Sequence, residues 1–139
     1  MKIILASHGS LADAMLEVLH AIMGDEDDVE AFSLNTYEDP VKLSEAVKQK
    51  IDAESGKPVI LVSDIKGGST FNHLLPFCVR PEVTLFAGMN LNLVLNLVNI
   101  QSAAEEDLLE VIDEAKAAIE YFNSEILQKM SSENDADAF

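Results

Sequence analysis

A histidine stands in the first turn of the chain, directly after a short apolar run. Ile-Ile-Leu-Ala at residues 3–6 precedes Ser7-His8-Gly9-Ser10, and apolar residues at helical spacing follow. This order predicts a strand, a tight turn and a helix, with His8 in the turn. The unperturbed pKa of histidine lies nearest neutral pH, and a ring nitrogen can act as a nucleophile. A turn histidine can equally be a cap, so a chemical role needs a second group.

A second polar loop follows the most apolar strand candidate, residues 59–62. It reads Ser63-Asp64-Ile65-Lys66-Gly67-Gly68-Ser69-Thr70. A carboxylate that accepts a hydrogen bond from one imidazole nitrogen fixes the tautomer and leaves the other nitrogen free to attack an electrophile. Taken singly, an aspartate here can be an ordinary cap and the two glycines an ordinary turn.

The chemistry that these groups predict together is a phosphoryl group carried on His8, with Asp64 orienting the ring. Glycines let backbone N–H groups approach an anion closely, and the hydroxyl groups of Ser69 and Ser10 stand beside them in the second loop and at the start of the first helix. The predicted phosphate-binding residues are therefore Ser10, Gly67, Gly68 and Ser69. No acidic cluster for magnesium and no Walker-type motif is present in the sequence, so we expect no metal, no cofactor and no direct use of ATP.

The segments that must place these residues alternate between strand and helix. Residues 90–99 suit either a strand or a helix, and the alternation favours a helix. Strands are expected at 2–7, 29–34, 59–62 and 83–87, and helices at 11–23, 40 to about 54, 71–79, 90–99 and 105–116. This pattern predicts an α/β fold, doubly wound around a mainly parallel four-stranded sheet in the order 2-1-3-4. The loops that carry His8 and Asp64 then meet at the switch point of the sheet, where ligands bind in such folds.

The end of the chain is expected to differ from the rest. Residues 117–123 either continue the last helix or form a short antiparallel edge strand. Residues 131–139 are polar and acidic, and we expect them to be a mobile tail on a single domain of residues 1–130.

Composition limits the classes of partner. The 139 residues are 48% apolar, which suffices for one core, and 25 acidic against 9 basic residues give a net charge of -16. Such a surface repels nucleic acid and anionic lipid and favours a basic protein partner.

Cys78 is the single cysteine, and His20 and His73 lie within helical patterns where structural or surface roles are expected. The first apolar run is too short for a signal peptide and no stretch is long enough to span a membrane, so a cytoplasmic protein is expected.

The two polar motifs, residues 3–10 and 63–72, resemble those of the enzyme IIA domain of the mannose-type (mannose/fructose/sorbose) sugar phosphotransferase system. The resemblance covers about residues 1–125. It implies that His8 takes a phosphoryl group from the phosphocarrier protein HPr and passes it to a IIB component on a separate chain. It also implies a homodimer that exchanges an antiparallel edge strand, for which 117–123 is the candidate, and only indirect membrane association through the transporter complex.

Two residues depart from the pattern of that family. Many members carry an aromatic residue where Lys66 stands and proline where Thr70 stands, which bears on the shape of the loop and on partner choice. The phosphotransferase subunit of dihydroxyacetone kinase looks similar in this domain. A non-catalytic module that binds a small anion or nucleotide is the alternative from another class, whereas a metal-dependent phosphatase would need a carboxylate cluster that the sequence lacks.

Overall fold

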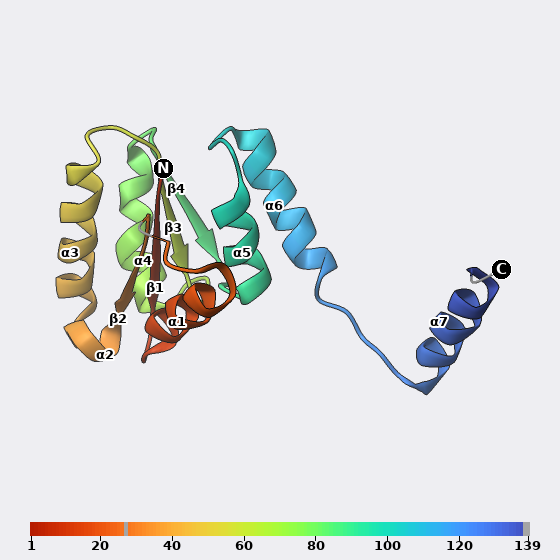
Figure 1. The fold of residues 1–139 in the computed structure, drawn as a ribbon. Helices are drawn as coiled ribbons and strands as arrows, with labels where there is room; N and C mark the ends of the chain where they lie inside the picture. The colour runs from red at the N-terminus through yellow and green to blue at the C-terminus, as the bar shows by residue number, and fades with distance from the viewer. Residues whose placement is uncertain (27, 138–139) are drawn as a thin grey trace.

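The centre of the molecule is a parallel sheet of four strands. In a computed structural model, which describes residues 1–26 and 28–137, the strands lie in the order β2-β1-β3-β4 (Figure 1). Their bounds are β1 (Lys2–Ser7), β2 (Val29–Ser33), β3 (Val59–Ser63) and β4 (Val83–Ala87). All three pairings are parallel. The predicted fold class and strand order are confirmed, and the less apolar second strand lies at an edge.

Helices cover both faces of this sheet. One face carries α1 (Leu11–Met23), α5 (Leu91–Asn99) and α6 (Glu105–Ala117). The other carries α2 (Leu34–Tyr37), α3 (Pro40–Ala53), α4 (Ser69–Leu74) and the 3₁₀ helix η1 (Leu75–Val79). The helices that follow β1 and β3 therefore leave on opposite sides of the sheet, as a doubly wound fold requires.

The core consists of two apolar layers, one on each face of the sheet. Ile3 and Leu5 of β1 face α1 and α5, whereas Ile4 and Ala6 face α3 and α4. All four side chains are buried. Alternate residues of a strand point to opposite faces, so a strand covered on both sides must be apolar throughout. This explains why the strands appear in the sequence as continuous apolar runs.

Side-chain caps fix two of the helix starts. Asp39 accepts a hydrogen bond from the Val41 amide at 2.8 Å, with Pro40 in the first helical position of α3. Asn90 accepts one from the Leu93 amide at 2.9 Å, and its neighbours 91–99 form α5. The cap decides the ambiguous segment 90–99 in favour of a helix.

One predicted helix is shorter than expected and two helices were not predicted. Helix α4 begins at Ser69 and ends at Leu74, and the chain then tightens into η1. Pro76 lacks the N–H that an α-helix needs at that position, so one continuous helix over 71–79 is wrong. The one-turn α2 and the terminal helix α7 (Ser124–Asp137) lack a strong apolar periodicity in the sequence.

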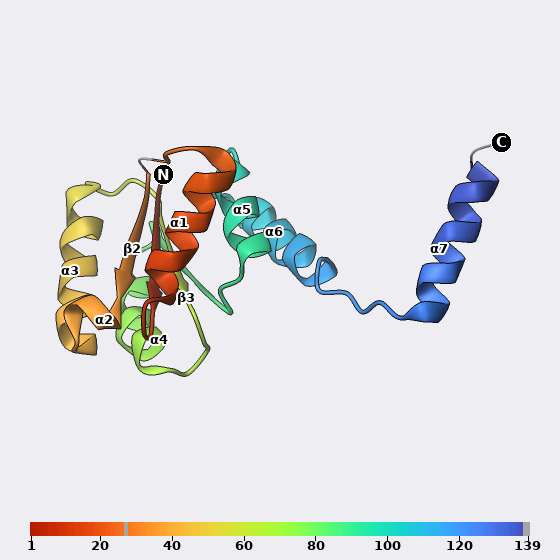
Figure 2. The same cartoon turned by 60° about the horizontal axis from the view of Figure 1, so that its bottom comes forward.

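The chain leaves the body of the molecule after α6. Residues 118–123 do not continue that helix, and they pair with no strand in the part of the chain that the structure describes. Both views show α7 standing apart from the sheet and its helices (Figures 1 and 2). The division at residue 130 and the mobility of 131–139 stay predictions, and residues 138–139 lie outside the described part. No helix within that part has the length and apolar character needed to cross a membrane.

Candidate functional site

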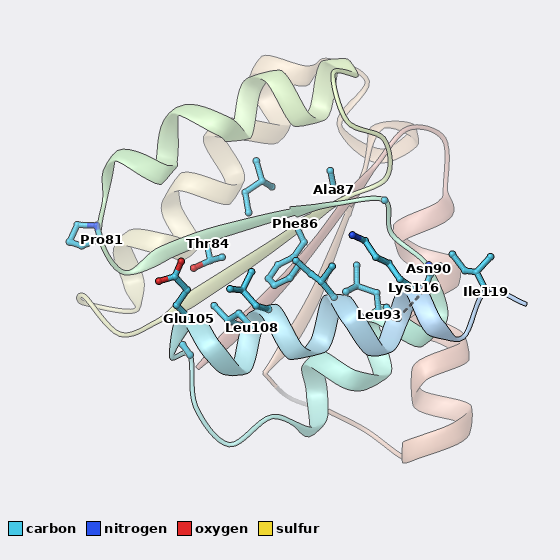
Figure 3. A pocket seen from close by; sticks show the side chains of 16 residues that line it. Pro81, Thr84, Phe86, Ala87, Asn90, Leu93, Glu105, Leu108, Lys116 and Ile119 are labelled. Carbon is cyan, nitrogen blue, oxygen red and sulfur yellow. Dashed lines mark hydrogen bonds between the residues drawn. The ribbon is translucent and has the colours of Figure 1, made fainter.

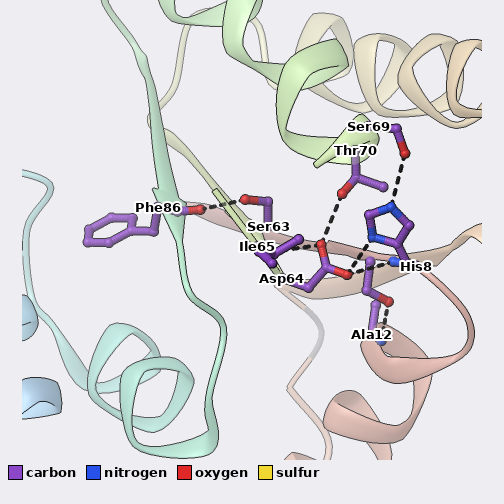
Figure 4. Close-up of polar contacts among 9 residues, drawn as sticks. His8, Ala12, Ser63, Asp64, Ile65, Ser69, Thr70 and Phe86 are labelled. Atoms are coloured by element: carbon purple, nitrogen blue, oxygen red, sulfur yellow. Dashed lines mark hydrogen bonds and ion pairs between the residues drawn. The ribbon is translucent and has the colours of Figure 1, made fainter. Parts of the chain in front are cut away.

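The sheet brings the two polar loops together at the carboxyl ends of neighbouring strands. Ala6 of β1 lies opposite Ser63 of β3, so His8 and Asp64 emerge side by side although 56 residues separate them in sequence. Figure 4 shows the two side chains pointing toward each other from these loops. This is the juxtaposition that strand order 2-1-3-4 predicts.

The Asp64 carboxylate holds His8 at two points. Its Oδ2 accepts a hydrogen bond from the His8 backbone N–H at 2.8 Å and lies 2.8 Å from the Nδ1 ring atom. An ionised carboxylate only accepts, so Nδ1 carries the proton and Nε2 has the free lone pair. The His8 side chain is 47% exposed and that of Asp64 only 12%. The carboxylate is thus covered while the ring remains open to a partner.

The environment keeps Asp64 ionised. Partial burial raises the pKa of its carboxyl group, because a charge is less stable away from water. Hydrogen bonds from the His8 backbone, the His8 ring and the Thr70 hydroxyl outweigh this effect, and the pKa lies below its ordinary value. At neutral pH the carboxylate can therefore both orient the ring and stabilise positive charge that develops on it.

The free nitrogen of His8 faces the start of α4. Ser69 Oγ lies 3.0 Å from His8 Nε2, so its hydroxyl donates to the lone pair when the site holds no ligand. Gly68 packs directly against the ring, because a Cβ atom there would lie 3.0 Å from His8 Cε1 and 2.8 Å from Ile65 Cγ2. Only glycine allows this approach without moving a neighbour.

The predicted phosphate-side residues are not equally placed. Gly67 has a φ of 80°, which favours glycine and turns the loop toward α4. The Gly68 amide already donates to the Ile65 carbonyl at 3.2 Å, so its N–H is not free for an anion. Ser10 is exposed at the start of α1 and makes no side-chain cap there. The phosphate-binding roles of Ser10, Gly67, Gly68 and Ser69 stay predictions.

Helix α1 offers fewer free N–H groups than the sequence predicts. The Ala12 amide donates to Ser7 Oγ at 2.7 Å, and the Asp13 amide donates to Ser33 Oγ at 3.1 Å. Both serines end a strand and are buried. Sequence reasoning missed these contacts, because serines at strand ends give no sign of which helix they will cap.

Sequence reasoning also missed the contacts that α4 makes with the site. Thr70 Oγ1 donates to Asp64 Oδ1 at 3.0 Å. Asn72 Nδ2 donates to the Gly67 carbonyl at 3.0 Å, and His73 Nδ1 lies 2.8 Å from the Ser69 carbonyl oxygen. His73 is exposed and makes a contact within its own helix, so the expected structural or surface role stays a prediction. A polar residue at every position from 69 to 73 except Phe71 was the available signal.

Comparisons with known proteins point to one family. The family described as PTS system fructose IIA component (EIIA-man) matches residues 2–116. No curated protein sequence matches the chain. A structure from Klebsiella pneumoniae, described as that of a candidate phosphoenolpyruvate-dependent sugar phosphotransferase system permease, is 30% identical with a TM-score of 0.80, covering 90% of this chain and 93% of that one.

Two further structures share the fold. A PTS IIA protein associated with the fucose utilization operon of Streptococcus pneumoniae is 26% identical with a TM-score of 0.73, over 93% of this chain and 95% of that one. A mannose/sorbose-specific IIA subunit from Enterococcus faecalis is 23% identical with a TM-score of 0.71, over 88% and 94%. On the strength of the family match over most of its length, this chain belongs to the mannose-type (EIIA-man) family of IIA components of the sugar phosphotransferase system.

Proposed function

We propose that the chain is a phosphoryl carrier that takes phosphate from phospho-HPr onto His8 Nε2 and passes it to a IIB component. The observation that carries the proposal is the pairing of Asp64 Oδ2 with His8 Nδ1 at 2.8 Å on an exposed ring. This pairing leaves the outer nitrogen with a lone pair that a partner can reach. Family membership supports a phosphotransfer role, and these partners would place the protein in the cytoplasm.

The proposed step exchanges one nitrogen–phosphorus bond for another. The lone pair of His8 Nε2 attacks phosphorus, and the bond to the imidazole of HPr breaks as the new bond forms. The electron pair of the broken bond returns to the donor ring. The Nδ1 proton of His8 stays in place, directed at Asp64, whose negative charge stabilises the positive charge that the substituted ring gains. Transfer to IIB is the same reaction in the outward direction.

We propose that the Ser69 hydroxyl changes its hydrogen-bond partner when His8 is phosphorylated. In the unphosphorylated site its hydroxyl lies 3.0 Å from Nε2. When phosphorus occupies that nitrogen, the hydroxyl can rotate and donate to a phosphoryl oxygen instead. One donor thereby serves both states of the ring without movement of the backbone.

We further propose that residues 118–123 add to β4 of a second copy. The outer edge of β4 pairs with no strand among the described residues and borders a cavity of about 660 Å³ (Figure 3). The cavity contains none of the site residues, and its lining includes the apolar side chains of Phe86, Leu108 and Ile112. Ile119, Tyr121 and Phe122 are 73%, 74% and 58% exposed. A strand placed along this edge would pair free backbone groups and cover the apolar lining, which supports a homodimer.

A reconstituted transfer assay tests the carrier role. The protein is incubated with enzyme I, HPr and phosphoenolpyruvate, and phosphate is mapped by mass spectrometry at alkaline pH. We expect labelling that requires HPr, is lost in His8→Ala, persists in the matched control His20→Ala in α1, and is discharged by added IIB. Label that persists in His8→Ala, or its absence from the unaltered protein, contradicts the proposal. Small-anion binding that survives His8→Ala without any labelling would instead support a regulatory module.

A further inference from the structure

We propose that Thr70 is a positioning residue, which ties the Asp64 carboxylate to α4 and so keeps His8 in its reactive tautomer. This inference rests on the proposed function of His8. It concerns a residue to which the sequence assigned no role in the site.

The hydrogen bonds of Asp64 fall into two pairs. Oδ2 faces the backbone N–H and the ring Nδ1 of His8. Oδ1 accepts from the Ile65 amide at 3.0 Å and from the Thr70 hydroxyl at 3.0 Å. The Ile65 amide belongs to the next residue in the loop and moves with it. The hydrogen bond from the Thr70 hydroxyl is the one that ties Oδ1 to a separate element, the first turn of α4 (Figure 4).

The burial of Thr70 favours its hydrogen bond to Asp64. Thr70 is fully buried, and its hydroxyl donates to the carboxylate. A buried hydroxyl that lost this partner would remain desolvated, so the structure favours keeping the bond. With Oδ1 held, rotation of the carboxylate about its last bond is restricted, and Oδ2 stays aligned with Nδ1.

The contact also links the two nitrogens of His8. Thr70 reaches Nδ1 through Asp64, and its neighbour Ser69 reaches Nε2 directly at 3.0 Å. His8, Asp64, Thr70 and Ser69 thus form a closed chain of side-chain contacts joined by one peptide bond of α4. We infer that loss of the Thr70 hydroxyl loosens both ends of the ring at once, although Thr70 does not touch the imidazole.

Three variants separate positioning from general stability. Thr70→Val keeps the shape and removes the hydroxyl, and Thr70→Ser restores it. Ser63→Ala is the matched control, because the Ser63 hydroxyl is equally buried and, although it belongs to the residue before Asp64, donates to the Phe86 carbonyl at 3.3 Å and not to Asp64 or His8. The first measurement is the pair of ¹⁵N chemical shifts of the His8 ring in unphosphorylated protein. The second is the rate of phosphate uptake from phospho-HPr.

We expect Thr70→Val to shift the His8 nitrogens from the pattern of a single Nδ1–H tautomer toward that of a tautomer mixture. Its phosphorylation rate should fall about tenfold, the scale of one lost hydrogen bond. Thr70→Ser and Ser63→Ala should stay within about twofold of the unaltered protein in rate, with unchanged nitrogen shifts. The return of both readouts in Thr70→Ser would mark the hydroxyl itself as the cause.

Unchanged nitrogen shifts and an unchanged rate in Thr70→Val overturn the inference. It is also overturned if folded Thr70→Ser behaves like Thr70→Val, or if Ser63→Ala produces the same shifts. Failure of the carrier role has a different signature, since the unaltered protein would then take up no phosphate. The nitrogen shifts of the unphosphorylated variants would still decide whether Thr70 positions the ring.

Discussion

The two nitrogens of His8 have different surroundings, and this difference defines the site. Nδ1 faces a carboxylate that is mostly covered, whereas Nε2 faces the Ser69 hydroxyl on a ring that is about half exposed. A neutral imidazole has one donor and one acceptor nitrogen. The donor nitrogen, Nδ1, points at Asp64, and the acceptor nitrogen, Nε2, is left for an incoming group, as a nucleophilic histidine requires.

Asp64→Asn tests this assignment. An amide cannot replace a carboxylate that receives four donors, so we expect the phosphorylation rate to fall about 10²-fold or more. The free energy of unfolding at pH 7 should also fall by about 1–3 kcal/mol. Uptake at the rate of the unaltered protein would contradict the role of Asp64.

The acid dependence of stability follows from the same carboxylate. Its pKa is lowered in the folded protein, so the unfolded chain takes up the proton at a higher pH than the folded chain. The stabilisation is therefore present above about pH 4 and is lost as the pH falls further. Denaturant titrations should show the difference between the unaltered protein and Asp64→Asn shrinking below pH 4. Glu30 and Asp52, whose pKa values are also lowered, remain in both proteins and cancel.

Gly68→Ala should disturb the ring by contact alone. Its φ of -72° suits any residue, so the expected cost comes from the added Cβ against His8 and Ile65. We expect a loss of about 1–3 kcal/mol in stability and slower phosphorylation. Adding Ile65→Ala removes one of the two contacts, so stability should recover in part while the rate stays low. Full recovery of the rate would show that the His8 contact is unimportant.

At the scale of elements, side chains at the ends of strands, and not the N-cap residue Ser10, fix the start of helix α1 beside the site. Ser7 and Ser33 end neighbouring strands. Their hydroxyl oxygens accept hydrogen bonds from the backbone amides of Ala12 and Asp13, respectively, in the first turn of α1. Helix α1 is thereby fixed to the sheet on the side opposite α4. The turn between β1 and α1 is held at both ends, which leaves His8 little freedom to drift from Asp64.

A pair of serine substitutions tests this bracing. Ser7→Ala leaves the buried Ala12 amide without its partner, and we expect a loss of about 1–3 kcal/mol in the free energy of unfolding. Ser10→Ala, three residues away on an exposed side chain, should change stability by less than about 0.5 kcal/mol. Chemical denaturation of both variants gives the comparison, and equal losses would argue against the bracing.

Most of the elements could be predicted because their signals are local. The apolar runs of β1 and β3 reflect burial on both faces, and the Asp39-Pro40 pair marks the start of α3. The pairing of His8 with Asp64 was predictable from strand order alone. The Thr70 contact was not, since it depends on how α4 begins, and α4 begins two residues before the apolar pattern does. The proposed exchange of residues 118–123 could not be predicted from the residues alone, because a short apolar segment does not say whether it pairs within its own chain or with a second copy.

For the whole molecule, the C-terminal segment is the feature that a single chain does not explain. Residues 118–123 carry large exposed apolar side chains, and the edge of β4 nearby borders a cavity with many apolar side chains in its lining. Exposed apolar strands and open sheet edges commonly mark interfaces. The net charge of -16 opposes association in general, so a dimer would need a specific apolar contact of this kind.

The double variant Tyr121→Asp/Phe122→Asp tests the exchange. Successive strand residues point to opposite faces, so one of these two side chains must face the cavity beside β4 of the partner. We expect the unaltered protein to sediment as a dimer and the double variant as a monomer. Leu127→Asp in α7 is the matched control, because its side chain is equally exposed but lies outside the segment, and it should remain dimeric. A monomeric unaltered protein would contradict the proposal.

The position of the phosphoryl group on the imidazole tests the central claim most directly. Protein labelled with ¹⁵N-histidine is phosphorylated by enzyme I, HPr and phosphoenolpyruvate, and NMR then identifies the His8 nitrogen that is coupled to phosphorus. The account predicts phosphorus on Nε2 with the proton retained on Nδ1 beside Asp64. Phosphorus on Nδ1 would contradict it, because that nitrogen would have to leave the carboxylate that holds it.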